Sequence, residues 1–465
     1  MELLKRFFKT SFLYLIGNVL TRAMSFIMVP LYTYYISPTD YGTYNYIVSI
    51  MAFFTTFCYF DLWSGILRFF FDYDDELGKN KCIFNGLIIF GVSSVIYAVC
   101  FSIFDSIMNV QYFVYIIISG ILGNLLNVYT YLARGYKANR LFVVSGLISS
   151  ALYFASNFVL LAYMHMDYSA IFISTSISSV CNIILIECNL NILMKIKLSF
   201  FDWHFLKCIL FFSLPLAINS SACWLLGGYN QIAVVNTLST YDNGIYSLAQ
   251  KFSAAIYFFT SCFQLAWQEI AFDSAGHNQD KGGFYANAVS YYADAMLIST
   301  LLLCSIIYVI FPLFVNGAYY ESLILIPFTI LQAGISAISA FLGNIFSAIK
   351  RTKYLFITFL TAGIINVMLL QLLLPYYGIQ IVNVILSFCM MIVVLLRIGM
   401  LKRYVRLSFN MTSIFVFFLI FAFVCYGYYL DNIGLIIFSL FFTIVVYGII
   451  NKSLIKICLN RITNS

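Results

Sequence analysis

The sequence predicts an all-α integral membrane protein with 14 transmembrane helices, arranged as two six-helix lobes and a two-helix C-terminal tail. Three observations favour this fold class. Only 9% of the residues are Asp, Glu, Lys or Arg and 63% are hydrophobic, whereas a soluble globular chain has about 25% charged residues. Fourteen apolar runs are long enough to cross a bilayer. The Lys and Arg residues also concentrate in every second turn, which is the charge pattern that orients a membrane protein.

The predicted spans are the apolar runs that lie between short polar turns. About 20 apolar residues cross a bilayer, and the longer runs permit tilting. The first run follows Lys5, Arg6 and Lys9 without a small-residue cleavage site, so we expect it to remain as a span. In order, the spans are 11–36, 42–69, 83–104, 111–133, 141–164, 168–194, 208–236, 243–268, 288–315, 322–349, 354–375, 379–401, 411–430 and 433–451.

The basic residues predict that both termini are cytoplasmic. With this orientation, 21 of the 25 Lys and Arg residues lie at the inner side and the outer turns carry none. The inner groups are Lys5/Arg6/Lys9, Lys79/Lys81, Arg134/Lys137/Arg140, Lys195/Lys197/Lys207, Lys281, Lys350/Arg351/Lys353, Lys402/Arg403/Arg406 and Lys452/Lys456/Arg461. The outer turns carry acidic residues instead: Asp40, Asp105, Asp167, Asp242, Glu321 and Asp431. One miscounted span would reverse this pattern for every later turn.

The composition argues against several classes of chemistry. The 12 cysteines contain no C-x-x-C pair and the three histidines are far apart, so we expect neither a disulfide framework nor a metal site. The few charges leave no surface for nucleic acid. No cofactor is expected, while coupling to H⁺ or Na⁺ stays open.

A short motif, D-x-G-x-Y, occurs at residues 40–44 and again at 242–246, 202 residues apart. Each copy occupies the first outer turn of a six-helix block. In both blocks an acidic inner loop is followed by a purely basic one. We therefore predict an N-terminal lobe over 1–194, a second lobe over 207–401 that repeats the first, and a tail over 402–465. Parallel repeats of this kind occur in transporters, with the substrate site between the halves.

The opening stretch carries a family resemblance through Gly17-Asn18, Arg22, Pro30-Leu31-Tyr32 and residues 37–42, Ser-Pro-Thr-Asp-Tyr-Gly. It resembles bacterial polysaccharide flippases, the O-antigen and capsule repeat-unit transporters of the multidrug/oligosaccharidyl-lipid/polysaccharide exporter superfamily. The resemblance implies two lobes around a central cavity, alternating access and an undecaprenyl-diphosphate-linked oligosaccharide as cargo. It also implies a monomer in the bacterial cytoplasmic (inner) membrane, with polysaccharide polymerase machinery as a further partner.

Two basic residues lie deep within predicted spans, where an ionisable group usually faces a cavity or a partner. Arg22 is about 20 Å of helix rise from the inner end of its span, with Asn18 on the same helical face. Lys251, beside Gln250, is the corresponding cation of the second lobe. We expect Arg22, Lys251, Asn18 and Gln250 to bind substrate, because guanidinium and ammonium groups recognise phosphate. Pairing of Arg22 with a carboxylate, or snorkelling of Lys251, is the alternative for each.

The remaining intramembrane charges have open roles. Asp61 lies seven residues before Arg68 on roughly the same helical face, so the two form a salt bridge or Asp61 is a coupling carboxylate. Glu187 pairs with Arg22 or Arg68, or reaches the interface. Arg68 and Arg397, near inner helix ends, are expected to snorkel to water. Asp294 is expected close to water, near the start of its span.

Three further hypotheses concern function. The acidic inner loop Asp72, Asp74, Asp75 and Glu76 could latch onto basic loops of the other lobe, although exposed pairs contribute only about 0–1 kcal/mol each. A cation-coupled drug antiporter of the same superfamily is the alternative transporter. A membrane enzyme of polysaccharide assembly is disfavoured, because the sequence shows no large outer loop and no clustered His and carboxylate groups.

Overall fold

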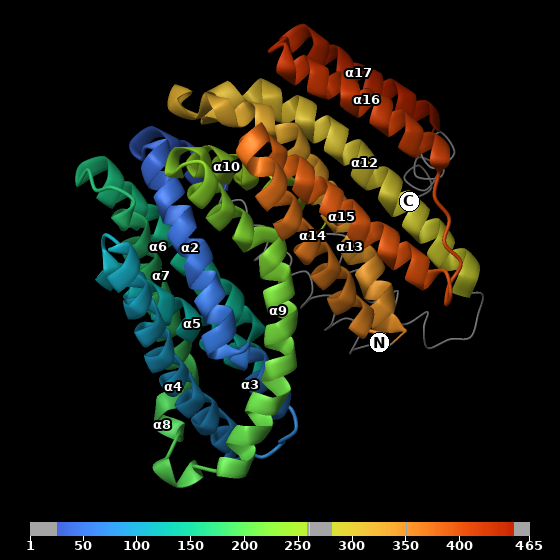
Figure 1. Cartoon of the computed structure of the whole chain (residues 1–465). Coiled ribbons are helices and arrows are strands. Elements are labelled where there is room, and N and C mark those ends of the chain that lie inside the picture. The colour runs from blue at the N-terminus through green and yellow to red at the C-terminus, as the bar shows by residue number, and fades with distance from the viewer. Residues whose placement is uncertain (1–25, 258–259, 261–280, 350, 451–465) are drawn as a thin grey trace. The chain divides into compact units, whose positions relative to one another are not determined.

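The computed structural model describes residues 26–257, 260, 281–349 and 351–450, and within these ranges the regular secondary structure is entirely helical. The chain divides into two compact units, Met1–Gly244 and Ile245–Ser465. In Figure 1 the first unit runs from blue to green and the second from yellow-green to red. The all-α prediction is confirmed for the described residues.

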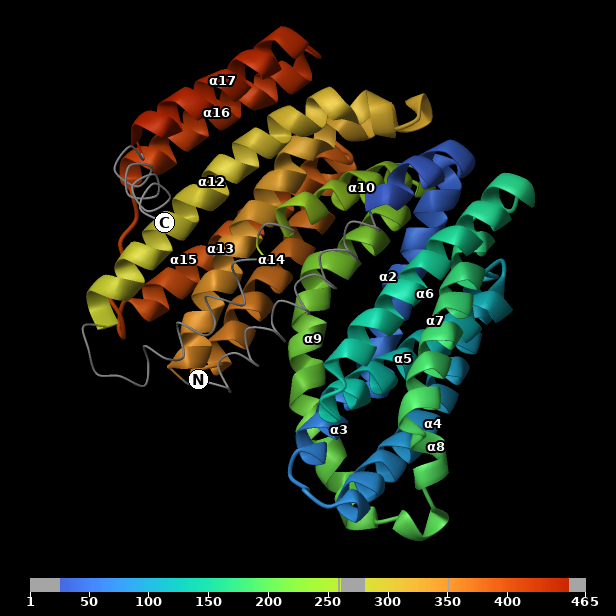
Figure 2. The same ribbon diagram turned by 180° about the vertical axis from the view of Figure 1, so that it is seen from behind.

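The first unit contains a set of long apolar helices joined by short turns. After a helical stretch over 26–35 come α2 (Pro38–Tyr59), α3 (Leu62–Phe70), α4 (Glu76–Met108), α5 (Phe113–Gly135), α6 (Asn139–Phe158), η1 (Val159–Tyr163), α7 (Ser169–Leu190), α8 (Ile192–Lys195), η2 (Leu198–Phe200) and α9 (Trp203–Thr237). Helix α7 packs against α5 and α6, whereas α9 packs against α2 and α3; both neighbourhoods can be followed in Figures 1 and 2.

Short-range capping explains where several of these helices begin. The Asp75 side chain accepts a hydrogen bond from the Gly78 amide at the start of α4. Asp202 does the same for the amides of His204 and Phe205 at the start of α9. Such caps satisfy amides that have no partner inside the helix, and an acidic residue there also matches the helix dipole.

The second unit is built around one deeply buried helix. Its elements are α10 (Thr240–Phe252), which begins at the end of the first unit, then α12 (Lys281–Phe314), η3 (Gly317–Leu325), α13 (Ile326–Ala348), α14 (Lys353–Tyr377), α15 (Gln380–Leu401), α16 (Met411–Tyr429) and α17 (Ile433–Ile450). The most apolar stretch of Gly317–Ala348 is 78% buried, the largest share among the described spans. Helices α12 and α15 flank α13, and α16 and α17 pack on each other and on α12.

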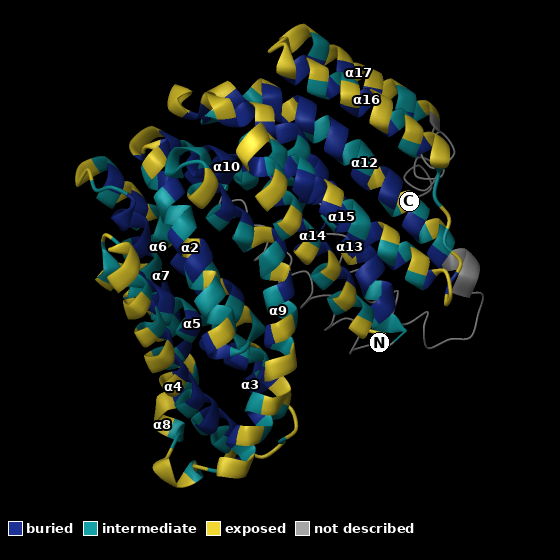
Figure 3. Cartoon of the chain, viewed as in Figure 1, coloured by how far each residue is buried: buried dark blue, intermediate teal, exposed yellow. Residues whose placement is uncertain are grey.

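Apolar side chains lie on the outer faces of the helices as well as inside. Figure 3 shows exposed positions recurring along α16 and α17, and they include Phe415, Leu419, Phe441 and Val445, each at least half exposed. A helix that is apolar on all sides is stable at a protein surface only when that surface faces lipid.

The described residues contain ten helices long and apolar enough to cross a membrane, or 11 if α2 and α3 form one bent span. A shorter apolar helix covers Ile433–Ile449. The predicted spans 11–36 and 243–268 lie partly outside the described residues. The chain is therefore a multi-pass helical membrane protein.

Candidate functional site

The two copies of the D-x-G-x-Y motif begin α2 and α10 with the same cap. Ser37 Oγ accepts a hydrogen bond from the Asp40 amide (3.1 Å) and donates one to the Asp40 carboxylate (2.8 Å). Ser239 Oγ accepts from the Asp242 amide (3.1 Å) and donates to the Asp242 carboxylate (2.5 Å). The serine also recurs at a spacing of 202 residues, so the repeated unit is longer than the sequence motif: S-x-x-D-x-G-x-Y.

Within the first unit, residues 38–42 and 240–244 pack against each other reciprocally. A Cβ atom on Gly42 would lie 1.7 Å from the Thr240 carbonyl oxygen, and one on Gly244 would lie 1.9 Å from the Pro38 carbonyl oxygen. Pro38 and Thr240 are themselves 202 residues apart. Asn243 Nδ2 adds a hydrogen bond of 2.7 Å to the Gly42 carbonyl oxygen. The two helix starts therefore make the same contact in both directions, and only glycine permits this approach.

The second predicted span, 42–69, is broken between α2 and α3. The two helices meet at an angle of 44°, and the residues at the break, Phe60 (φ 52°) and Asp61 (φ 55°), are both left-handed. Neither is glycine, so each costs about 1–2 kcal/mol in this conformation. The Asp61 carboxylate accepts a hydrogen bond from Ser64 Oγ (3.1 Å). A carboxylate thus sits at a break inside a membrane span.

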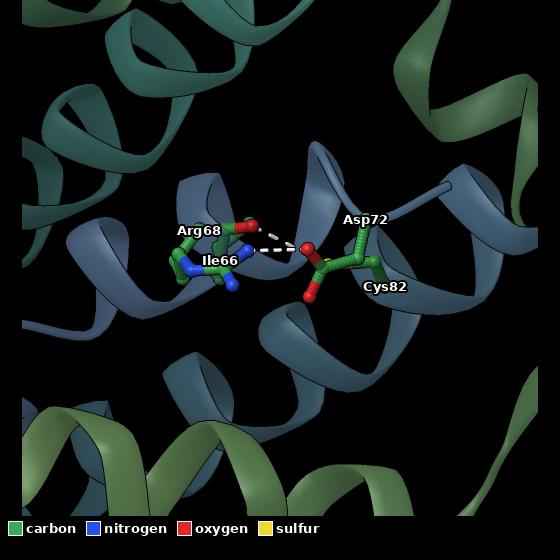
Figure 4. A network of polar contacts seen from close by, with 4 residues as sticks. All are labelled: Ile66, Arg68, Asp72 and Cys82. Atoms are coloured by element: carbon green, nitrogen blue, oxygen red, sulfur yellow. Dashed lines mark hydrogen bonds and ion pairs between the residues drawn. The ribbon is translucent and has the colours of Figure 1, made fainter. Parts of the chain in front are cut away.

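Arg68 does not pair with Asp61, so the structure contradicts the salt bridge, one of the two roles considered for Asp61. Its guanidinium instead forms an ion pair with the Asp72 carboxylate one turn further on (Figure 4). Helix α3 ends at Phe70, so the side chain reaches the polar turn beyond it. Close by, Cys82 Sγ donates a weak hydrogen bond to the Ile66 carbonyl oxygen (3.4 Å), which joins α4 to α3. Arg68 is more than half exposed, as snorkelling predicts.

The acidic inner loop has local partners among the described residues. Asp72 binds Arg68, and Asp75 caps α4. Two of the four carboxylates proposed for an electrostatic latch therefore have structural roles within the first unit.

Glu187 is placed at the end of α7. One carboxylate oxygen accepts a hydrogen bond from the Leu193 amide (2.8 Å), and the Asn191 amide donates to the Glu187 carbonyl oxygen (2.7 Å). The structure gives it a role in the turn between α7 and α8. It does not bring Glu187 to Arg68, whose ion pair is with Asp72.

Gln250 is joined to the core of the second unit. Its Nε2 donates to Asn383 Oδ1 on α15 (2.7 Å), and Asn383 Nδ2 donates to Thr329 Oγ1 on α13 (2.8 Å). Asn383 is fully buried, so this amide chain ties three helices together. Lys251 follows in the last turn of α10 and is half-buried. Asn18 and Arg22 lie outside the described residues.

Two charged residues differ from the expectation of contact with water. The Arg397 side chain is buried, 1% exposed: Nη1 donates to the Ser339 carbonyl oxygen (2.5 Å), Nε donates to Thr358 Oγ1 (3.2 Å), and the guanidinium lies 4.6 Å from the Phe359 ring centroid. Because α15 packs against both α13 and α14, the side chain cannot snorkel. Asp294 is also buried, at 5% exposure, on a helix packed by α13, α16 and α17.

No group of three or more His, Cys, Asp or Glu residues that could hold a metal ion occurs in the part of the chain that the structure describes.

Comparisons with known proteins agree with the architecture. A family model described as "Polysaccharide biosynthesis protein" matches residues 7–267. A search of curated proteins found no match. The structure is similar to the lipid II flippase MurJ in an inward closed conformation, with a TM-score of 0.70 and 16% identity, covering 95% of this chain and 99% of that one.

It is also similar to a multidrug resistance MATE family transporter of the MOP superfamily. The inward-facing form has a TM-score of 0.66 and 13% identity, covering 82% of this chain and 96% of that one. For an outward-facing form the TM-score is 0.57 and the identity 13%, with coverages of 85% and 95%. At these identities the likeness establishes the fold.

Proposed function

This chain belongs to the polysaccharide biosynthesis protein family, and from that premise we propose that it is a flippase. Its cargo is an undecaprenyl-diphosphate-linked oligosaccharide, moved from the inner to the outer leaflet of the bacterial cytoplasmic membrane for surface polysaccharide synthesis. The family match over residues 7–267 carries this proposal. A fold shared with a lipid II flippase over 95% of the chain supports it.

The proposed topology has 14 spans, with both termini cytoplasmic. The positive-inside distribution of 21 of the 25 basic residues supports it. In this proposal residues 1–194 and 207–401 form the two lobes, and residues 402–465 form the tail.

Alternating access is the proposed mechanism, and the reciprocal contact of the two motif copies supports it. Gly42 and Gly244 lie at the outer ends of their spans in the proposed topology. Their backbones are packed so closely that the contact cannot loosen gradually. It therefore has two discrete states, one with the two helix starts in contact and one with them apart. We assign the formed contact to a state closed on the outer side, and its separation to the opening that releases cargo.

Arg22 and Lys251, with Asn18 and Gln250 beside them, are the proposed contacts for the diphosphate. Two phosphates in a low-dielectric cavity require cationic partners, and an arginine fork binds phosphate oxygens in pairs. The hydrogen bond from Gln250 to Asn383 would fix the last turn of α10, and with it the neighbouring Lys251.

The test is export in cells that lack the gene. Complementation with the wild type should restore surface glycan, and Arg22→Ala and Lys251→Ala should each reduce it at least tenfold at equal protein level, since losing one charge-assisted contact costs about 1.5–3 kcal/mol. Lys402→Ala, an exposed inner-loop cation, is the matched control. Normal export by both cavity variants would refute the cationic-site mechanism. Failure of the wild type to restore export would refute the flippase itself.

A second candidate is a cation-coupled drug antiporter, which the likeness to a multidrug resistance transporter supports. It predicts that expression raises drug resistance in a sensitive host, independently of glycan export. The family match favours the flippase.

A further inference from the structure

The outer end of the second unit contains a pocket of about 380 Å³. Three separate turns contribute polar side chains to it: Glu321 from η3, Gln380 from the start of α15, and Asp431 from the turn between α16 and α17. In the proposed topology all three turns are on the outer side. A smaller adjoining hollow of about 190 Å³ shares Ile324, Gln380 and Tyr428 with it.

The acidic residues of the outer turns differ in whether their carboxylates accept hydrogen bonds from neighbouring groups. Five of the six accept hydrogen bonds from nearby groups: Asp40 from Ser37, Asp105 from the Val110 amide, Asp167 from the Ser169 amide, Asp242 from Ser239 and Asp431 from Tyr308. Glu321 forms no hydrogen bond or ion pair with any described residue. Glu321, which lines the pocket, is thus the one of the six that accepts no hydrogen bond from a described residue.

The other polar groups of the pocket also have unused hydrogen-bonding capacity. Tyr308 Oη donates to Asp431 Oδ1 (2.6 Å), which fixes the carboxylate and leaves Oδ2 without a partner among the described residues. The Gln380 amide likewise has none there, so it can both donate and accept. Tyr320, 42% exposed, presents an aromatic ring at the rim, held edge-on by Phe311 at 5.9 Å between centroids.

We propose that this pocket is a sugar-binding subsite. A sugar ring has many hydroxyl groups, each both donor and acceptor, and one apolar face of C–H groups. Carboxylates that accept, an amide that does both, and an aromatic or aliphatic wall match the two surfaces of such a ring. A metal ion fits less well, because the described residues hold no cluster of three candidate ligands. The choice of a glycan rests on the proposed function, whereas the pocket itself does not.

The test uses the purified full-length protein in nanodiscs and saturation-transfer NMR. The probes are glucose, N-acetylglucosamine, and the repeat-unit oligosaccharide released from the host's lipid carrier. We expect binding by the wild type, and a rise in Kd of about fivefold or more for Glu321→Gln and for Tyr320→Ala. Tyr115→Ala is the matched control, because Tyr115 is also 42% exposed and does not line the pocket.

Several results would overturn the subsite: no transfer to any sugar, equal binding by the two pocket variants and the wild type, or an equal loss in the Tyr115 control. Stabilisation by calcium chloride alone, lost in Glu321→Gln, would instead identify a metal site. Thermal unfolding of each variant checks folding. Competition by free exported polysaccharide or by the lipid-linked repeat unit shows which source supplies the sugar. Export is scored separately, so the flippase and the subsite can fail independently.

Discussion

Arg397 is a permanently charged side chain that the second unit buries among three helices. Its hydrogen bonds go to a backbone carbonyl oxygen on α13 and a hydroxyl group on α14, and Phe359 lies against the guanidinium. The planar fork reaches both partners at once, which a lysine ammonium cannot do from the same position. Arg397 therefore connects α13, α14 and α15.

We expect Arg397→Lys to destabilise the protein by about 2–4 kcal/mol, because a buried charge would keep only part of its hydrogen bonding. Arg397→Met should cost less, since it removes the charge together with its desolvation penalty. Thermal unfolding in detergent would measure both. The assignment is wrong if Arg397→Lys melts at the wild-type temperature.

Gly42 offers a residue-level test of the reciprocal contact. A methyl group there would lie 1.7 Å from the Thr240 carbonyl oxygen. Gly42→Ala should therefore lower the free energy of unfolding by about 1–3 kcal/mol and reduce export. Gly146→Ala is the control, because a Cβ atom on this helical glycine meets nothing within 4 Å. That change should be neutral or stabilising by about 0.5–1 kcal/mol. Equal behaviour of the two variants in unfolding and export would contradict the contact.

At the scale of the element, the break between α2 and α3 depends on two left-handed residues. Asparagine tolerates this conformation and alanine does not. Asp61→Asn should therefore retain wild-type stability, whereas Asp61→Ala should lose about 1 kcal/mol. Unfolding temperatures of the pair, compared with Asp74→Ala in the exposed turn beyond α3, would measure this. If both Asp61 variants lose the same stability, the carboxylate rather than the backbone conformation is responsible.

The break between α2 and α3 separates what the sequence predicts from what it does not. The apolar runs predicted where helices form, because lipid requires long segments with internal hydrogen bonds. They did not predict a break at Phe60 and Asp61, where no proline or glycine signals one. Nor could they distinguish Arg68, which reaches a polar turn, from Arg397, which is covered by neighbouring helices. That difference depends on packing between distant segments, which spacing along one helix does not report.

At the scale of the whole molecule, the resemblance seen in residues 17–42 named the family that the match over 7–267 confirms. The 202-residue spacing of the short motif recurs in the structure, where Gly42 and Gly244 make the same close backbone contact. The division into two repeated lobes stays a prediction. The sequence did not reveal the pocket in the second unit. Glu321, Gln380 and Asp431 are distant in the chain, and their convergence is a property of the fold.

Helices α16 and α17 of the tail form hydrogen bonds with α12, which makes their topology testable. Tyr428 Oη donates to the Cys304 carbonyl oxygen (2.6 Å), Tyr308 Oη donates to Asp431 (2.6 Å), and Ser305 and Ser439 hydroxyl groups lie 3.1 Å apart. These contacts place α16 and α17 alongside α12 through the membrane. The proposed topology puts Lys402, Arg403 and Arg406 at the inner side, so it predicts that Asp431 is outside.

Reporter fusions at two positions would test this orientation. Alkaline phosphatase fused after Asp431 should be active, because that enzyme matures only outside the cytoplasm. Green fluorescent protein fused after Ser465 should fluoresce, because the proposed topology has a cytoplasmic C-terminus. Phosphatase fused after Leu401 is the inactive control. The reverse pattern at 431 and 465 would put Asp431 in the cytoplasm, which requires either an even number of spans before it or an N-terminus on the outer side. It would then move the sugar pocket to the cytoplasmic side, so this one measurement constrains both the topology and the direction in which the pocket faces.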